Sequence, residues 1–344
     1  MVFLLHCFTL LFYRKARFSG YGPTKQSNNQ SLMRSRNFAV LLGLLAMGFT
    51  PPDEKTIRDA IGDVSQLPVQ LQRAFTPDRD AFGPIPTPAP GDWLAGHQEQ
   101  DQTFEQFKAS SPNRPAPNRN IIYFQPLGDF AANRSPSLEQ LREFAAAFFA
   151  MEIKTLPSVP IENFPTRRNP FTHNPQILTT DVLRFVKARV PADAFCVLAI
   201  TMEDLYPEAS WNFVFGQASL RDRAGVYSFA RYDPVFYGEA RTSGYEVLLL
   251  RRSCRVLAHE TSHMFGLTHC TFFNCLMNGS NHLAESDRRP LHLCPVCLRK
   301  LQWISGFDVL ARYSALEQFN RTAGFSDEAE WLKAQIQKIR AENK

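Results

Sequence analysis

Apolar runs of strand length alternate with segments of helical periodicity between residues 119 and 232. An uninterrupted apolar run predicts a buried strand, whereas apolar residues that recur every three or four positions predict an amphipathic helix. These patterns predict strands at 120–128, 152–157, 194–202, 211–219 and 224–232, and helices at 135–151 and 179–190. This order predicts an α+β fold in which helices pack on a mixed, twisted sheet.

A longer helix is predicted to begin after Gly244 and to end at Gly266. Its apolar residues recur at helical spacing for about five turns. Further helical patterns follow a cysteine-bearing loop, one beginning near Cys294 and two covering 307–320 and 326–342. The last has acidic residues at its start and lysines toward its end, as the helix dipole favours.

The first fifty residues contain a separate apolar run, which begins at Asn37 behind Arg34 and Arg36. At about a dozen residues it is too short to span a bilayer comfortably and is typical of a secretory signal, with Met33 as an alternative start. We therefore interpret residues 1–50 as a leader, either a signal peptide or an organellar transit segment. A signal peptide predicts a secreted or periplasmic protein, and the alternatives are a cytoplasmic or an organellar location.

The rest of the chain divides into a proline-dense segment and a catalytic domain. Prolines in residues 51–118 favour extended segments over long helices, so we interpret this part as an N-terminal wrap over the catalytic body. The catalytic domain is then 119–344, with an upper part at 119–266 and a lower, cysteine-rich and helical part at 267–344.

Composition and charge limit the classes of protein. A chain with 44% hydrophobic and 21% charged residues is expected to form a packed body and not a disordered segment. The net charge of +5 is small for 344 residues and comes mainly from the leader. Without a dense basic patch that contains aromatic residues, no nucleic-acid partner is expected. No other apolar run approaches transmembrane length, so no membrane partner is expected for the mature chain.

The sequence HETSHMFGLTH places three histidines at regular gaps on and after the long helix. His259 and His263 are four residues apart, so both rings project from one helix face and can bind one ion. Gly266 can end the helix with a positive φ, and the chain then turns back so that His269 becomes a third ligand. Three imidazoles leave one tetrahedral position of a zinc ion open to water, and Glu260 is placed to act as the general base.

Four cysteines form a second predicted site: Cys270, Cys275, Cys294 and Cys297. A CxxC pair with two further thiols at loop distance suits a closed structural zinc site. The alternative is a pair of disulfides, which an exported chain would favour. Met277 follows in CLMNGS, where a methionine in a tight turn would provide an apolar floor beneath the histidines.

These residues resemble the metzincin clan, whose members carry HExxHxxGxxH followed by a methionine turn. More closely they resemble the archaemetzincins, the archaelysin family of metallopeptidases, in which a cysteine cluster follows the helix motif. Two segments outside the motif also resemble archaemetzincin sequences: GDWLAGHQEQDQTFEQF and SNHLAESDRRPLHLCPVCLRKLQ. The resemblance covers most of residues 90–305.

The resemblance implies a metzincin-like zinc protease fold with an active-site helix and a cysteine-rich C-terminal subdomain. It implies two zinc ions per chain, one catalytic and one structural, and peptide or protein substrates. In such folds an edge strand borders the cleft and pairs with an extended substrate, and 211–219 is the candidate. Aminopeptidase activity is the leading expectation, and we expect a monomer.

Two other functions were considered. The main alternative is a non-catalytic binding protein that zinc stabilises, but a structural zinc site does not require the carboxylate of Glu260. A zinc ribbon for nucleic acid is disfavoured by the acids Glu285 and Asp287 in its loop.

Overall fold

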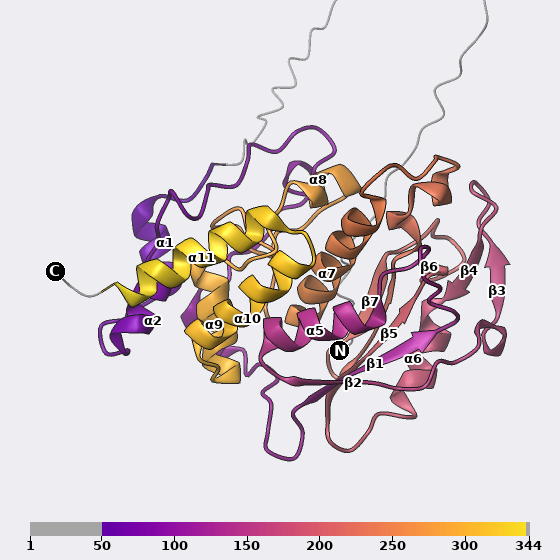
Figure 1. Cartoon of the computed structure of the whole chain (residues 1–344), viewed down its shortest axis with the longest axis horizontal. Coiled ribbons are helices and arrows are strands. Elements are labelled where there is room, and N and C mark those ends of the chain that lie inside the picture. Colours follow the sequence, from indigo (N-terminus) through magenta and orange to yellow (C-terminus); the bar gives the residue numbers. More distant parts are fainter. Residues whose placement is uncertain (1–49, 342–344) are drawn as a thin grey trace, which may run out of the picture.

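The computed structural model describes residues 50–341, so the predicted leader lies outside the described residues except for Thr50. Figure 1 shows a sheet crossed by one long helix, α7 (Tyr245–Met264), with the C-terminal helices beyond it. Within the described part, no helix is both long and apolar enough to cross a membrane.

The main sheet has five strands in the order β2-β1-β5-β8-β7, and a smaller sheet has the order β3-β4-β6. Strands β2, β1, β5 and β8 run parallel, whereas β7 pairs antiparallel with β8 at the edge. The strands are β1 Ile121–Leu127, β2 Glu152–Thr155, β3 Thr166–Arg168, β4 Pro175–Leu178, β5 Ala194–Thr201, β6 Asp204–Tyr206, β7 Gly216–Ser219 and β8 Ala224–Ser228. The α+β class with a mixed sheet and packed helices is therefore confirmed.

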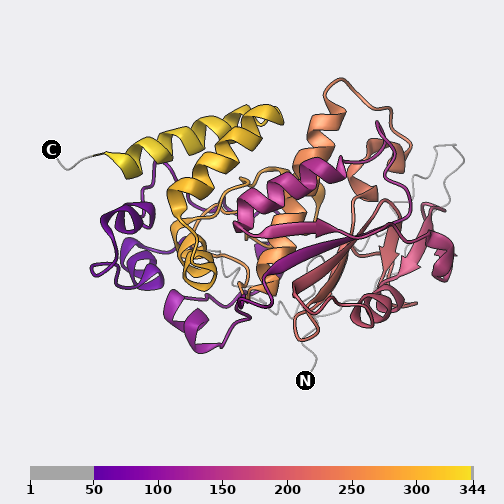
Figure 2. The same ribbon diagram turned by 60° about the horizontal axis from the view of Figure 1, so that its bottom comes forward.

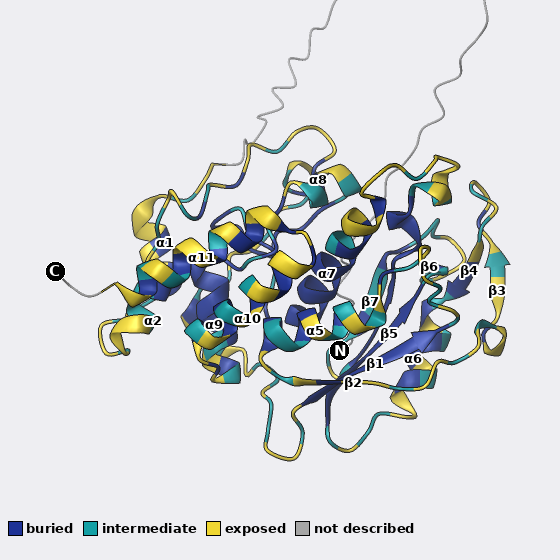
Figure 3. Ribbon diagram, in the orientation of Figure 1, coloured by how far each residue is buried: buried dark blue, intermediate teal, exposed yellow. Residues whose placement is uncertain are grey.

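Both faces of the inner strands β1, β5 and β8 are covered, which explains why these strands are mainly apolar. In β1, Ile122 and Phe124 belong to the large core that includes residues of α5 and α7, while Ile121 and Tyr123 belong to a second core with α6. All residues of β1 and β5 are buried. Figure 3 shows the same strands and most of α7 in the buried class.

The helices cover both faces of the sheet and form the lower half of the molecule. They are α1 Glu54–Ile61, α2 Val69–Ala74, α3 Trp93–Gly96, α4 Phe104–Ala109, α5 Leu138–Phe149, α6 Thr179–Lys187, α7 Tyr245–Met264, α8 Leu283–Asp287, α9 Pro295–Ser305, α10 Val309–Thr322 and α11 Ser326–Arg340. Short 3-10 helices lie at Ile161–Asn163, Ala230–Tyr232 and Pro234–Tyr237.

The long helix α7 begins and ends where the glycines predicted. Gly244 is the N-cap residue with φ of 81°, and Gly266 follows the last turn with φ of 90°. A Cβ at Gly266 would also lie 2.8 Å from Cβ of Pro112, so glycine is required by conformation and by space. The helix therefore stops before His269, which leaves the chain free to turn back.

The proline-dense segment contains four short helices, α1 to α4, and packs against the lower half. Figures 1 and 2 show its indigo part beside the yellow C-terminal helices, where α2 contacts α11 and α1 contacts α9. Its Phe75, Phe82 and Phe107 belong to the main core. The Arg299 guanidinium of α9 donates to the carbonyl of Asp63 at 2.6 Å. This segment is therefore a packed part of the fold.

Three features differ from the sequence prediction. The predicted strand 224–232 ends at Ser228, and Ala230–Tyr232 form a short 3-10 helix. The predicted edge strand 211–219 is shortened to β7 at its C-terminal end, because Arg167 donates to the carbonyl of Trp211 and Val214 pairs with Leu205 of β6. The smaller sheet, in which β4 pairs with β6 and β3, was not predicted. Its strands are only three or four residues long, which is too short to show a period.

Candidate metal centre

The structure brings His259, His263 and His269 together into one buried cluster. One ring nitrogen from each lies within 4.8 Å of the others, and the ring centroids are 4.8 to 5.4 Å apart. The first two come from adjacent turns of α7, and the third comes from the loop after Gly266. The predicted trio of imidazoles thus converges on one point.

The partner of each Nδ1 atom determines which ring nitrogen is available. The Nδ1 of His259 is 2.9 Å from the carbonyl oxygen of Leu276, and that of His263 is 2.6 Å from the carbonyl oxygen of Leu267. The Nδ1 of His269 is 2.7 Å from Oε1 of Glu99. Carbonyl and carboxylate oxygens only accept, so each Nδ1 carries the hydrogen.

In a neutral ring the remaining nitrogen, Nε2, then carries a lone pair. The Nε2 atoms of His259 and His263 are 3.1 Å apart, and two lone pairs at that distance repel unless a cation lies between them. Burial lowers the pKa of His259 well below its ordinary value and that of His263 to about 3, so both rings are neutral. This arrangement fits a zinc ion, which takes neutral imidazole nitrogens.

Glu260 lies next to His259 on α7 and is only 5% exposed. Burial raises the pKa of the neighbouring Tyr232 phenol far above its ordinary value, and the charge of Glu260 adds to this effect. A buried carboxylate one residue after one of the converging histidines is of the kind that can accept a proton from a water molecule.

The four cysteines also converge, from two loops and the start of α9. The Sγ atoms of Cys270, Cys275, Cys294 and Cys297 lie within 4.8 Å of one another, all are buried, and none forms a disulfide. Backbone N–H groups of Met277 and Cys294 donate to Sγ of Cys275 at 3.4 and 3.3 Å. Four sulfurs this close together, one of which accepts from backbone N–H groups, suit a closed thiolate site for zinc.

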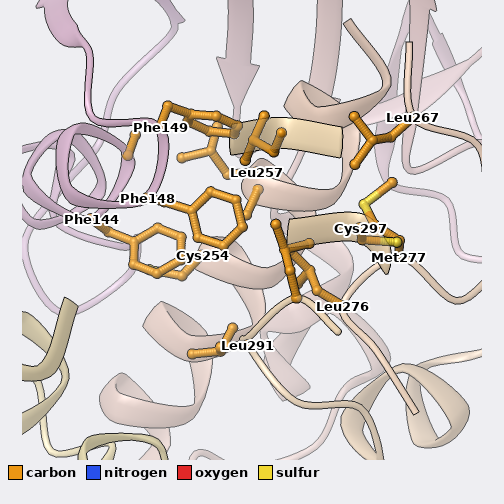
Figure 4. Packing of buried hydrophobic residues seen from close by; sticks show 14 of the residues in the cluster. Phe144, Phe148, Phe149, Cys254, Leu257, Leu267, Leu276, Met277, Leu291 and Cys297 are labelled. Carbon is orange, nitrogen blue, oxygen red and sulfur yellow. The ribbon is translucent and has the colours of Figure 1, made fainter. Parts of the chain in front are cut away.

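Met277 is fully buried in the turn that follows Cys275, and the same turn supplies Leu276 to His259. The backbone N–H of Cys270 donates to the carbonyl of Met277 at 2.8 Å. Figure 4 shows Leu276 and Met277 among the buried apolar residues that include Cys254 and Leu257 of α7. This turn therefore joins the histidine cluster to the cysteine cluster.

Asn278 holds this turn through three buried hydrogen bonds. Its Nδ2 donates to the carbonyls of Cys270 and Phe273 at 2.7 and 2.9 Å, and its Oδ1 accepts from the N–H of Cys275 at 2.7 Å. Asn278→Ala is expected to lower the free energy of unfolding by about 2–4 kcal/mol, because buried backbone groups lose their partners. Chemical denaturation measures this, and Asn274→Ala in the same loop is the control, with a loss below about 1 kcal/mol. Equal losses would contradict this role.

A third group of possible ligands lies at Asp92, His282 and Glu285, where one atom of each lies within 4.8 Å of the others. Arg288 donates to Asp92 at 2.8 Å, and Arg289 lies 3.7 Å from Glu285. Because these guanidinium groups already balance the acids, we interpret the group as an ion-pair network. The sequence analysis did not assign these residues to a metal site.

Glu99 is not among the predicted site residues, and it lies 170 positions before its partner His269, in the proline-dense segment. Burial acts to raise the pKa of Glu99, but the hydrogen bonds that its carboxylate accepts from His269 and Trp93 lower it, and the pKa lies below its ordinary value. No local spacing could relate the two residues. The one sequence feature that could have pointed to Glu99 is that it lies within GDWLAGHQEQDQTFEQF, a segment that resembles the archaemetzincins.

Comparison with known proteins places this site in a family. The model of Peptidase family M54 matches residues 175–303. Archaemetzincin-2 of Homo sapiens is 45% identical over 276 residues, which cover 72% of this chain and 76% of that protein. The chain belongs to the archaemetzincin family. As an archaemetzincin it is a zinc metallopeptidase, as its residues predicted, and its substrates are peptides or proteins.

Other proteins are more distantly similar to this chain. Archaemetzincin-1 of Mus musculus is 35% identical over 282 residues, which cover 73% of this chain and 56% of that protein. The crystal structure of archaemetzincin from Methanopyrus kandleri is 28% identical, covers 56% of this chain and 99% of its own, and has a TM-score of 0.39. A zinc-dependent peptidase from Methanocorpusculum labreanum is 26% identical, with 53% and 99% coverage and a TM-score of 0.41.

Proposed function

We propose that His259, His263 and His269 bind the catalytic zinc ion through their Nε2 atoms and that Glu260 is the general base of peptide-bond hydrolysis. The observation that carries this proposal is the set of Nδ1 hydrogen bonds, because it directs three Nε2 atoms toward one buried point. When bound there, zinc supplies a Lewis acid that polarises the scissile carbonyl and makes water more acidic.

The chain's own residues then perform the proton transfers. Glu260 takes a proton from the attacking water and passes it to the departing amine. Its position one residue after His259 on a helix that is buried at this end keeps the carboxylate close to the reacting atoms. The reaction proceeds without a covalent intermediate on the protein.

The peptide substrate is proposed to pair with β7, the edge strand of the main sheet. Main-chain pairing at a sheet edge accepts any extended peptide, so selectivity must come from side-chain contacts. Aminopeptidase action and a monomeric state are the finer parts of the proposal, supported by the resemblance alone.

We further propose that Cys270, Cys275, Cys294 and Cys297 bind a second, structural zinc ion. The mutual proximity of the four sulfurs and the N–H donors to Cys275 support this proposal over two disulfides.

We also propose that the leader is cleaved. N-terminal sequencing of the mature chain is the test.

Removal of zinc is expected to abolish hydrolysis, and added zinc is expected to restore it. The test is digestion of a peptide library by the purified chain before and after treatment with a chelator, with His259→Ala as the control for contaminating proteases. Release of N-terminal residues would support the aminopeptidase type, and internal cleavage would overturn it. Hydrolysis that survives both the chelator and His259→Ala would overturn the metallopeptidase site, whereas a zinc-loaded but inactive chain would favour the binding-protein alternative.

A further inference from the structure

One ligand of the candidate zinc site is oriented by a residue from the N-terminal segment. Oε1 of Glu99 accepts from Nδ1 of His269 at 2.7 Å, and the indole N–H of Trp93 donates to the same oxygen. The Trp93 ring also meets the His269 ring edge to face, with centroids 5.1 Å apart. The His97 ring stacks on the Trp93 ring, with centroids 3.7 Å apart. The His269 ring is therefore held at its Nδ1 atom and along its edge.

The segment that carries Glu99 is fixed at both ends. Before Glu99, the backbone N–H of Trp93 donates to Glu285 at 2.9 Å. The Trp93 ring lies so close to Gly279 that a Cβ there would be 2.5 Å from it. After Glu99, the hydroxyl of Thr271 donates to Asp101.

Gln102 extends this attachment to the loop that carries the third histidine. Its side chain donates to the carbonyl of Gly266 at 3.2 Å and accepts from the N–H of Thr268 at 3.3 Å. The buried Lys300 ammonium donates to the same amide oxygen at 3.1 Å. These contacts hold the Glu99 backbone in place relative to residues 266–271, so its carboxylate has little freedom to leave His269.

The acceptor of His269 differs from those of the other two histidines. His259 and His263 donate to carbonyls of the adjoining loop, 17 and 4 residues away in sequence. His269 donates to a carboxylate, and a charge-assisted hydrogen bond of this kind is stronger than one to a carbonyl. In zinc sites such a partner orients the ring, increases its basicity and raises metal affinity by about 10–100-fold.

We propose that Glu99 is a positioning residue for His269, so that the N-terminal segment is part of the zinc site. The carboxylate holds Nδ1 of His269 as the donor and points Nε2 at the position shared with the other two rings. This inference rests on the proposed function of the histidine cluster. It predicts that zinc affinity depends on a residue outside the histidine motif and outside the matched region 175–303.

The test is a zinc competition titration of the full chain against a chromophoric chelator, with Glu99→Ala, Glu99→Gln and Gln100→Ala. At the histidine site the dissociation constant of zinc is expected to rise about 10–100-fold in Glu99→Ala. Glu99→Gln keeps an acceptor oxygen but loses the charge, so a smaller rise of about 3–10-fold is expected. Gln100→Ala changes an exposed neighbour and should match the parent chain.

Two further measurements separate the possible failures. The unfolding midpoint of the zinc-free chain should be similar in all these variants, because a positioning role does not require Glu99 for folding. If Glu99→Ala does not fold, the isosteric Glu99→Gln decides, and an affinity equal to that of the parent chain overturns the inference. If His259→Ala removes a zinc ion but neither Glu99 variant weakens binding, only this inference fails. If His259→Ala removes no zinc, the proposed function fails with it.

Discussion

Glu260→Gln is expected to lower kcat/KM for peptide hydrolysis by about 10²–10⁴-fold while the zinc content stays unchanged. Glutamine has nearly the same shape as glutamate, so the packing of the buried end of α7 is kept. It cannot accept the proton of the attacking water, because its side chain has no basic oxygen at neutral pH. Since Glu260 is not one of the converging ligands, the three imidazoles are expected to bind zinc as before.

Steady-state hydrolysis and metal analysis on the same preparation measure this result. The matched control is Glu246→Gln, which removes an exposed carboxylate from the first turn of the same helix and should retain full activity. Turnover of Glu260→Gln close to that of the parent chain would remove Glu260 as the base. Loss of zinc together with activity would instead indicate that the carboxylate supports the metal.

Cys294→Ser is expected to lower the zinc stoichiometry from two to one and the unfolding midpoint by about 10 °C or more. Cys294 is the N-cap residue of α9, and its Sγ lies 3.6 Å from that of Cys270. Binding free energy at a structural zinc site is folding free energy, because the ligands are separated in the unfolded chain. Without the fourth thiolate, α9 and the loop after His269 lose their common attachment.

Cys254→Ser is the matched control, because it also places a hydroxyl in a fully buried position but leaves the four thiols intact. It is expected to retain two zinc ions and to lose only about 1–3 kcal/mol. Metal analysis, thiol titration and thermal unfolding together give the result. One zinc ion, with only the thiols of Cys7, Cys196 and Cys254 reactive in the unfolded parent chain, would establish the disulfide alternative. Two zinc ions in Cys294→Ser would exclude Cys294 as a ligand.

The sequence predicted the helix that carries the first two histidines because that information is local. Helical spacing places His259 and His263 on one face, and Gly266 ends the helix through a backbone conformation that glycine adopts most easily. The same reasoning located the inner strands of the main sheet, since burial on both faces makes β1, β5 and β8 mainly apolar. A CxxC pair at the start of a helix likewise marked two of the four thiols.

The tertiary structure alone decided how these residues are held. Which acceptor each Nδ1 meets depends on Leu276 and Leu267, whose carbonyls carry no side-chain signal, and on Glu99, which is 170 positions from His269. The shortening of the edge strand and the docking of residues 51–118 depend in the same way on contacts between distant segments. Local sequence records the preferences of neighbouring residues, whereas hydrogen bonds between distant segments exist only once packing has brought them together.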